Sequence, residues 1–378
     1  MEKKKVVVGM SGGVDSSVAA YLLKEQGYEV IGVTMEVWQP LSQKEQQLEG
    51  GCCGLSAIED ARRVAAELDI PYYVMNFRDI FQEKVINKFI DEYLHARTPN
   101  PCILCNRFVK WEALLNRSLA MGADFIATGH YAKVVKLEED LYQGKYTEKT
   151  KGSICNSMGR YAIKKSITKK KDQTYALYNL TQEQLRHTLM PIGDYTKEEV
   201  RDIAKRKGLP VAEKPDSQEI CFVLDKDYAG FIQKEIGYCV PEGNFIDKNG
   251  TILGRHKGLI HYTIGQRKGL QLSLGRPVYV SKLLPKTNEV VIGEETEVFT
   301  KVISCNDLNH MAVPRFPTND LVMAKIRYGN KEMPCRIEYL EEDKCLCTFE
   351  DSVRAAAPGQ AIVFYQGDIV LGGGTILA

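Results

Sequence analysis

The sequence of 378 residues predicts an α/β protein with a parallel-sheet N-terminal domain, a small central α+β domain and a C-terminal antiparallel β-barrel. Roughly the first 130 residues alternate short apolar runs with longer helical patterns, which is typical of a parallel sheet covered by helices. From about Gly230 glycines become frequent, and the remaining chain breaks into strand-sized pieces separated by turns. That pattern is typical of a small barrel.

The elements of the N-terminal part follow from apolar periodicity. Continuous apolar runs predict buried strands, whereas apolar residues spaced three and four apart predict helices. The expected strands cover residues 5–10, 29–33, 71–76 and 124–128, and the expected helices cover residues 16–26, 56–68, 81–94 and 107–121. Residues 39–54 are rich in Gln and Glu and end in GGCCG, so we expect a mobile loop there.

The later elements are short and β-rich. The runs HYTI and PVYVSKL belong to the central part, and VMAKIRY, CRIEYL, KCLCTFE, AIVFYQ and IVLGGGTIL supply strands for the barrel. The expected domains are residues 1–222, 223–290 and 291–378, which agrees with the two or three domains that this length predicts.

Composition excludes two classes of protein. Hydrophobic residues make up 44% of the chain, too many for a disordered protein. No run of 18 apolar residues occurs, so we expect no membrane span. Taken over the whole chain, the net charge of +1 argues against a nucleic-acid binder. However, residues 1–290 carry 42 Lys/Arg and 36 Asp/Glu, whereas residues 291–378 carry 8 and 13, so the charge is unevenly divided.

The chain has 11 cysteines, an odd number. The basic start followed by VVVGM lacks a small-residue cleavage site, which favours a strand over a signal peptide. Together these features predict a cytoplasmic protein with free thiols. We expect six cysteines to act as small buried hydrophobes: Cys155, Cys239, Cys305, Cys335, Cys345 and Cys347.

A glycine- and serine-rich loop connects the first expected strand to the first expected helix. Its sequence is VGMSGGVDSS, ending at Ser17. A helix N-terminus offers unpaired N–H groups and a positive dipole end, and glycines let the backbone approach phosphate oxygens. Asp15 is suited to hold Mg²⁺ beside the phosphates. Neither GxxxxGK[ST] nor GxGxxG occurs, and the run SGGVDSS instead resembles the signature of ATP pyrophosphatases, which split ATP between the α- and β-phosphates.

Two cysteine-bearing segments form a second constellation. The first is TPNPCILCN, with Cys102 and Cys105, and the second is DSQEICF, with Cys221. A CxxC pair is ambiguous between a metal site, a redox pair and chance. A second CxxC or His pair at short spacing is missing, which disfavours structural zinc.

Over nearly its whole length the chain resembles the bacterial tRNA-specific 2-thiouridylases. The matching segments are GMSGGVDSS, NPCILCN, ATGHYA, KKDQTYALYNL, DSQEICF, HYTIGQRKGL, KIRY and APGQAIVFY. The resemblance implies that ATP activates the wobble uridine (U34) of tRNA and that sulfur replaces its C2 oxygen. It also implies tRNA acceptors for Lys, Glu and Gln, ATP with Mg²⁺, and a cysteine desulfurase or sulfur-relay protein as donor.

The same resemblance implies roles for individual residues. Cys105 matches the nucleophile, and Cys221 matches the cysteine that carries the persulfide. The implied ATP contacts are Gly9, Met10, Ser11, Gly12, Gly13, Val14, Asp15, Ser16, Met35 and Gly129. Asn100, Pro101 and Cys102 match the segment that faces the target base. The other implied tRNA contacts are His130, Lys171, Asp172, Gln173, Arg327, Tyr328 and Gln360.

Cys102 departs from the family pattern, which usually has Asp at this position. Two explanations stay open. Cys102 takes over proton transfer from that Asp, or Cys102, Cys105 and Cys221 ligate a [4Fe–4S] cluster whose free iron binds sulfide. Two other functions also stay open: thiolation of another RNA base, and a non-catalytic RNA-binding or redox-sensing protein on the same fold.

Overall fold

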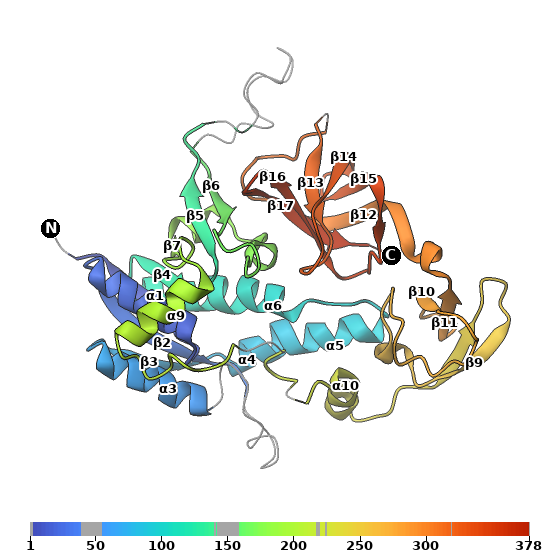
Figure 1. The fold of residues 1–378 in the computed structure, drawn as a ribbon, viewed down its shortest axis with the longest axis horizontal. Coiled ribbons are helices and arrows are strands. Elements are labelled where there is room, and N and C mark those ends of the chain that lie inside the picture. The colour runs from blue at the N-terminus through green and yellow to red at the C-terminus, as the bar shows by residue number, and fades with distance from the viewer. Residues whose placement is uncertain are drawn as a thin grey trace.

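The computed structural model describes residues 3–38, 55–139, 141, 159–216, 220–223, 225–318 and 320–377. A five-stranded parallel sheet, a four-stranded mixed sheet and a barrel organise these residues (Figure 1). The predicted α/β fold with a terminal β-barrel is confirmed. The loop expected at residues 39–54 lies outside the described residues.

The parallel sheet has the strand order β3-β2-β1-β4-β7. Its strands are β1 (Lys5–Gly9), β2 (Glu29–Glu36), β3 (Tyr72–Asn76), β4 (Phe125–Thr128) and β7 (Thr188–Leu189). In the central strand β1, Val6, Val7 and Val8 are fully buried, because both faces of the sheet are covered. Gly9 pairs with Thr128, so the chain leaves β1 and β4 side by side at the carboxyl edge of the sheet.

Helices cover the two faces of this sheet. The helices α1 (Val14–Glu25), α3 (Leu55–Glu67) and α9 (Lys197–Arg206) pack with Val6 and Val8, and α1 and α9 lie side by side (Figure 1). The opposite face, which presents Val7, packs against α4 (Arg78–Phe81), the π-helical η1 (Gln82–Ile86) and α5 (Asn87–Leu94). Successive strand residues point to opposite faces, which explains this division.

A second helical run covers the same face as α4 and α5. It comprises α6 (Pro101–Leu104), the π-helical η2 (Cys105–Leu114) and α7 (Leu115–Ala120), without a break. The sequence predicts a helix only from residue 107. The earlier start follows from Asn100, whose side-chain oxygen accepts a 3.1 Å hydrogen bond from the Cys102 N–H, and from Pro101 at the first helical position.

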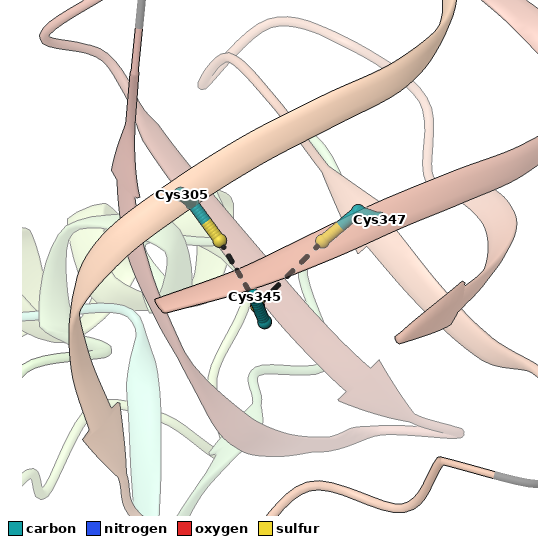
Figure 2. Close-up of side chains that lie close together, drawn as sticks. All are labelled: Cys305, Cys345 and Cys347. Atoms are coloured by element: carbon teal, nitrogen blue, oxygen red, sulfur yellow. Dashed lines mark hydrogen bonds between the residues drawn. The ribbon is translucent and has the colours of Figure 1, made fainter. Parts of the chain in front are cut away.

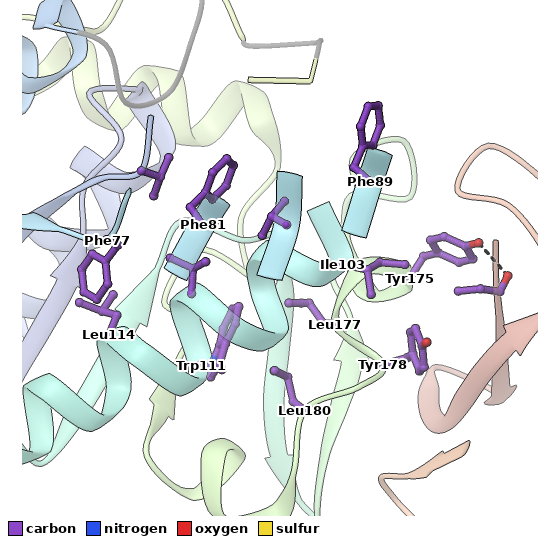
Figure 3. Packing of buried hydrophobic residues seen from close by; sticks show 14 of the residues in the cluster. Phe77, Phe81, Phe89, Ile103, Trp111, Leu114, Tyr175, Leu177, Tyr178 and Leu180 are labelled. Carbon is purple, nitrogen blue, oxygen red and sulfur yellow. Dashed lines mark hydrogen bonds between the residues drawn. The ribbon is translucent and has the colours of Figure 1, made fainter. Parts of the chain in front are cut away.

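The hydrophobic core beneath these helices extends to the barrel (Figure 3). Phe81, Phe89 and Trp111 fill it from the helices, and Tyr175 closes it at the far end. The Tyr175 hydroxyl donates a 2.8 Å hydrogen bond to the carbonyl of Ala361 in the barrel. One core therefore joins the first and last parts of the chain.

A hairpin of β5 (Ala132–Lys136) and β6 (Tyr161–Lys165) projects from the N-terminal part (Figure 1). Strand β6 pairs with the barrel strand β17, so the hairpin extends the barrel sheet. The 3₁₀-helix η3 (Thr174–Leu177) and α8 (Gln182–Arg186) follow it. These elements are not among those predicted from the sequence.

The central part begins with α10 (Tyr228–Ile236) and contains β8 (Gly243–Ile246), β9 (Ile252–His256), η4 (Leu259–His261), β10 (Tyr279–Leu284), β11 (Glu289–Gly293) and η5 (Glu295–Val298). Its sheet has the order β10-β11-β8-β9 around a small core that includes Phe245 and Val290. Strand β11 continues past residue 290, so this sheet extends beyond the boundary expected from the sequence.

The barrel consists of β12 (Phe299–His310), β13 (Val322–Lys325), β14 (Met333–Glu341), β15 (Lys344–Arg354), β16 (Ala361–Gln366) and β17 (Ile369–Ile376). The strand order is β12-β15-β14-β13-β16-β17, and pairing of β12 with β17 closes the ring. Closure leaves none of these strands as an exposed edge.

Three cysteines meet inside the barrel (Figure 2). Cys345 and Cys347 are two residues apart and share a face, and Cys305 is paired with Cys345 across the strands. The Cys345 Sγ lies 3.2 Å from the Cys305 Sγ and 4.0 Å from the Cys347 Sγ. These three and Cys335 are fully buried, as predicted. Cys239 is exposed, so that prediction is wrong, and Cys155 lies outside the described residues.

Candidate active site

The phosphate-binding candidate lies at the carboxyl edge of the parallel sheet. The loop after β1 turns at Gly12, which has φ +65°, and α1 starts at Val14. The Ser16 hydroxyl accepts a 3.2 Å hydrogen bond from the Ser11 N–H and donates one of 3.2 Å to the Gly13 carbonyl. The loop is therefore held by its own serines, with the helix N-terminus behind it.

Three further predicted ATP contacts, Gly9, Met35 and Gly129, lie beside this loop. A Cβ on Gly129 would lie 2.6 Å from the backbone nitrogen of Ser16, so only glycine lets β4 approach the loop this closely. A Cβ on Gly9 would lie 3.9 Å from the Met35 side chain. The structure thus brings together Gly9, Met35, Gly129 and the loop from Met10 to Ser16.

Asp15 is held by two side chains. Its Oδ1 accepts a 2.7 Å hydrogen bond from the Tyr131 hydroxyl and lies 2.7 Å from the Lys197 Nζ. Burial and the Asp15 carboxylate raise the pKa of Tyr131 far above its usual value, so the hydroxyl stays protonated and donates. Asp15 is therefore ordered in the position where the sequence places a Mg²⁺ ligand.

The Asp216 carboxylate forms ion pairs with three basic side chains. Its carboxylate lies 2.8 Å from both the Lys197 Nζ and the Lys171 Nζ, and 3.0 Å from Arg201. Burial alone would raise the pKa of Asp216, but hydrogen bonds from Lys171 and Lys197 outweigh it and lower that pKa to about 2. No pattern in the sequence indicates Lys197 or Arg201, because only the fold brings α9 to this place.

Cys102 and Cys105 lie at the start of the long helical run. Cys102 is exposed in its first turn, whereas Cys105 is half-buried against the hydrophobic core. The barrel fixes the preceding residues, because the Thr98 N–H donates to the Pro358 carbonyl and the Gln360 amide donates a 2.8 Å hydrogen bond to the Thr98 carbonyl. The CxxC segment is thus positioned by both ends of the chain.

Cys221 reaches the same core from another direction. It is half-buried, and the ring of the next residue, Phe222, packs edge-on against Phe81 and Phe89 at 5.6 and 5.3 Å. Cys105 and Cys221 therefore pack against one hydrophobic cluster, although they are far apart in sequence.

Tyr328 follows β13, and 47% of its surface is exposed. Its ring lies 6.3 Å from Tyr175, edge to face. Burial raises the pKa of Tyr328, the nearby Asp172 and Cys102 add to the rise, and Lys171 opposes it. The structure thus places Tyr328 close to three other predicted contact residues.

Other predicted tRNA contacts have partners within the protein. His130 is buried, its Nδ1 lies 2.6 Å from the Thr128 hydroxyl, and burial holds its pKa well below the usual value, so the ring is neutral at pH 7. Gln173 accepts a 2.8 Å hydrogen bond from the Tyr131 N–H. Asp172 accepts one of 2.6 Å from Thr174.

Arg327 is also engaged internally. Its guanidinium donates a 3.0 Å hydrogen bond to the Ile264 carbonyl of the central part, and burial lowers its pKa. Its Nε is buried without a hydrogen-bond partner among the described residues. The roles of Arg327, His130, Asp172, Gln173 and Gln360 in binding tRNA stay predictions.

Three cysteine sulfurs also lie close together in the barrel, away from Cys102, Cys105 and Cys221. Within the described ranges, the group whose ligand atoms all lie within 4.8 Å is the barrel set Cys305, Cys345 and Cys347. Asp15 fits Mg²⁺ through its carboxylate oxygen, because hard cations prefer such ligands.

Over the part of the chain that the structure describes, no helix is both long and apolar enough to cross a membrane.

Comparison with known protein families assigns the three parts of the chain. The tRNA methyl transferase HUP domain matches residues 4–225, the tRNA methyl transferase PRC-barrel domain matches residues 229–294, and the aminomethyltransferase beta-barrel domain matches residues 302–376. The fold and the phosphate loop thus define a protein of the nucleotide-binding HUP class.

Whole-chain relatives narrow this class. The tRNA-specific 2-thiouridylase MnmA of Lachnoclostridium phytofermentans is 59% identical over 99% of both chains. The proteins of the same name from Acetivibrio thermocellus and Clostridioides difficile are 55% and 52% identical, over 100% and 99% of this chain and 100% and 98% of theirs. The chain belongs to the tRNA-specific 2-thiouridylase family.

Proposed function

We propose that this protein catalyses the ATP-dependent 2-thiolation of the wobble uridine (U34) of tRNA. One observation carries the proposal: the same N-terminal domain holds the SGGVDSS loop at the carboxyl edge of its sheet and two half-buried cysteines, Cys105 and Cys221, that pack against one hydrophobic cluster. Whole-chain similarity to proteins named tRNA-specific 2-thiouridylase supports the choice of substrate. Binding and cleavage of ATP would account for the presence of the loop, and sulfur transfer would account for the two cysteines.

The first step activates the uracil. The C2 oxygen is a poor leaving group, so it attacks the α-phosphate of ATP, which makes it part of AMP and releases pyrophosphate. The loop N–H groups and the α1 N-terminus bind the phosphates. Gly12 and Gly129 let the loop pack closely against the backbone of Ala57 and against the chain after β4. Asp15 is the residue that would hold Mg²⁺, which neutralises phosphate charge when bound.

The second step transfers sulfur. A desulfurase or sulfur-relay protein places a persulfide sulfur on Cys221, and this outer sulfur attacks C2 as AMP departs. The Cys105 thiolate then attacks the inner sulfur of Cys221 and breaks the S–S bond, so 2-thiouridine leaves and a Cys105–Cys221 disulfide remains. A thiol reductant donates two electrons to restore both thiols.

Cys102 has two proposed roles. At the exposed first turn of a helix, where the dipole stabilises a thiolate, it accepts and donates the proton that the family's Asp handles. Alternatively, Cys102, Cys105 and Cys221 ligate a [4Fe–4S] cluster that carries the sulfide, and then no disulfide forms. Anaerobic reconstitution with iron and sulfide separates these roles: absence of bound iron and of a visible absorbance band rules out the cluster.

The proposed tRNA surface combines several parts of the chain. Asn100, Pro101 and Cys102 face the target base, and Lys171 and Tyr328 lie beside them. The proposed domains are residues 1–222, 223–290 and 291–378, the last two gripping the tRNA, and the proposed compartment is the cytoplasm. The proposed acceptors are the tRNAs for Lys, Glu and Gln.

The test supplies tRNA, ATP and Mg²⁺ anaerobically and measures nucleosides by mass spectrometry. One arm contains a cysteine desulfurase and cysteine as the persulfide donor, and a second arm contains sulfide. We expect 2-thiouridine at position 34, with tRNA-dependent release of pyrophosphate. A thiolated base at another position would assign a different RNA substrate. No pyrophosphate release with any tRNA would favour a non-catalytic RNA-binding or redox-sensing protein.

A further inference from the structure

Five charged side chains from separate segments meet beside the phosphate loop. Asp15 comes from α1, Lys197 and Arg201 from α9, Lys171 from the segment after β6, and Asp216 from the segment that leads to Cys221. These ion pairs form one continuous chain of contacts. Neither phosphate binding by the loop nor sulfur transfer by the cysteines requires these ion pairs.

Lys197 is the central link of this chain. Its Nζ lies 2.7 Å from Asp15 and 2.8 Å from Asp216, and only 10% of its side chain is exposed. A lysine this buried is unusual unless it is paired. Its side chain also lies over the Tyr131 ring, 5.8 Å from the ring centre. Lys197 therefore holds two carboxylates of different segments at a fixed separation.

The charges around Asp216 do not balance. Three cations face two carboxylates, so the cluster carries an excess positive charge next to the place proposed for phosphates. Mg²⁺ or phosphate that arrives at Asp15 competes with the Asp15–Lys197 pair. A backbone phosphate of RNA that arrives at Lys171 competes with the Lys171–Asp216 pair. A phosphate at Lys171 therefore removes one partner of Asp216. A ligand at Asp15 instead leaves Asp216 as the one remaining carboxylate of this cluster that is paired with Lys197.

We propose that Asp216 is a positioning residue that couples the nucleotide loop to the segment bearing Cys221. The inference rests on the proposed function, because it assigns Asp15 to Mg²⁺-ATP and Cys221 to sulfur. Occupation of Asp15 releases Lys197 from its second carboxylate, so that Lys197 interacts with Asp216 alone. Asp216 precedes Cys221 by five residues, and a change in how Asp216 is held is the proposed signal to that cysteine. Sulfur delivery is thereby tied to the presence of ATP.

The experiment measures how fast iodoacetamide alkylates Cys221, read by peptide mass spectrometry, with and without Mg²⁺ and a non-hydrolysable ATP analogue. The unaltered protein is expected to change this rate at least about threefold when the analogue binds. In Asp216→Asn and in Lys197→Met the change is expected to fall below about 1.5-fold. The Kd of the analogue is expected to stay within about threefold in Asp216→Asn.

A matched control lies on the same helix. Lys205 of α9 pairs with Glu213 at 3.0 Å, but both side chains are exposed, so Lys205→Met should respond as the unaltered protein does. Asp216→Glu, which keeps the charge, should restore at least half of the response. That rescue separates positioning from a loss of folding.

A full nucleotide response in Asp216→Asn would overturn the inference, and so would an unaltered protein whose Cys221 does not respond to the analogue. These measurements contain no tRNA and no sulfur donor. A failure to form 2-thiouridine would therefore contradict the proposed function, whereas the alkylation rates decide the coupling separately.

Discussion

Cys105 and Cys221 are the residues on which the proposed chemistry depends most directly. Replacing either by Ala removes the sulfur that carries the persulfide or attacks it, so thiolation should fall by about 10⁴-fold or more. Both side chains are only half-buried, so the fold should persist. Mass spectrometry of tRNA nucleosides measures the product, and nucleotide binding in the same variants provides the control. Substantial 2-thiouridine formation by either variant would exclude the persulfide route.

Cys102 separates the two versions of the mechanism. If it transfers protons, Cys102→Ala should lose activity and Cys102→Asp should recover it, because Asp is the family's usual residue. If it ligates a cluster, both variants should lose bound iron. Iron analysis and product formation, measured on the same preparations, distinguish these results. Full activity in Cys102→Ala would remove both explanations.

Asp216 also predicts a pH dependence of stability. Its pKa of about 2 in the folded protein is below the unfolded value of about 3.9. The stabilisation is therefore fully present above about pH 4 and is lost as the pH falls toward 2. Urea unfolding at pH 7 and pH 3 should show a smaller pH effect for Asp216→Asn than for the unaltered protein. Equal pH effects in the two proteins would contradict this assignment.

At the scale of elements, the turn between β1 and α1 is tightly constrained. Gly12 has φ +65°, and a Cβ there would lie 2.3 Å from the backbone oxygen of Ala57 in α3. Gly12→Ala must therefore move α3 or the loop, which should cost about 1–3 kcal/mol in strain and weaken ATP binding. Gly27→Ala is the matched control, because Gly27 also has positive φ but nothing lies within 4 Å. Equal ATP affinity in both variants would count against this role of the loop.

The elements that the sequence predicts well are those encoded locally. Strand β1 and helix α1 follow from a valine run and the loop after it. The hairpin of β5 and β6 is missed because its barrel partner, β17, pairs through Ile369 and Lys164, far apart in sequence. The charge network is missed for the same reason, since Lys197 and Asp15 are 182 residues apart. Nothing in a polar, amphipathic helix indicates which lysine the fold will bury.

At the scale of the whole molecule, the net charge of +1 is the sum of a basic part and an acidic part. The first 290 residues carry the excess of Lys and Arg, whereas the acidic barrel belongs to the last 88 residues. In the structure the barrel nevertheless contacts the CxxC segment, the central part and the β5–β6 hairpin. The acidic composition of the barrel therefore does not prevent it from contacting the segment that bears Cys102 and Cys105.

Gln360 allows a test of whether the barrel positions the segment that bears Cys102 and Cys105. Its amide donates hydrogen bonds to the carbonyls of Thr98 at 2.8 Å and Pro99 at 3.4 Å, immediately before the CxxC segment. Gln360→Ala removes these donors and should lower kcat for thiolation about tenfold, because small misplacements of a reacting group are costly. The barrel strands should be unaffected, since Gln360 lies in the turn between β15 and β16.

Gln360→Glu sharpens this prediction, because a carboxylate would face two carbonyl oxygens with no proton to donate. Its kcat should fall below that of Gln360→Ala, although the side chain has nearly the same size. Thermal unfolding measures stability separately and should shift by only a few degrees in each variant. If Gln360 serves only to bind tRNA, both variants should raise KM and leave kcat intact, which would contradict a positioning role for the barrel.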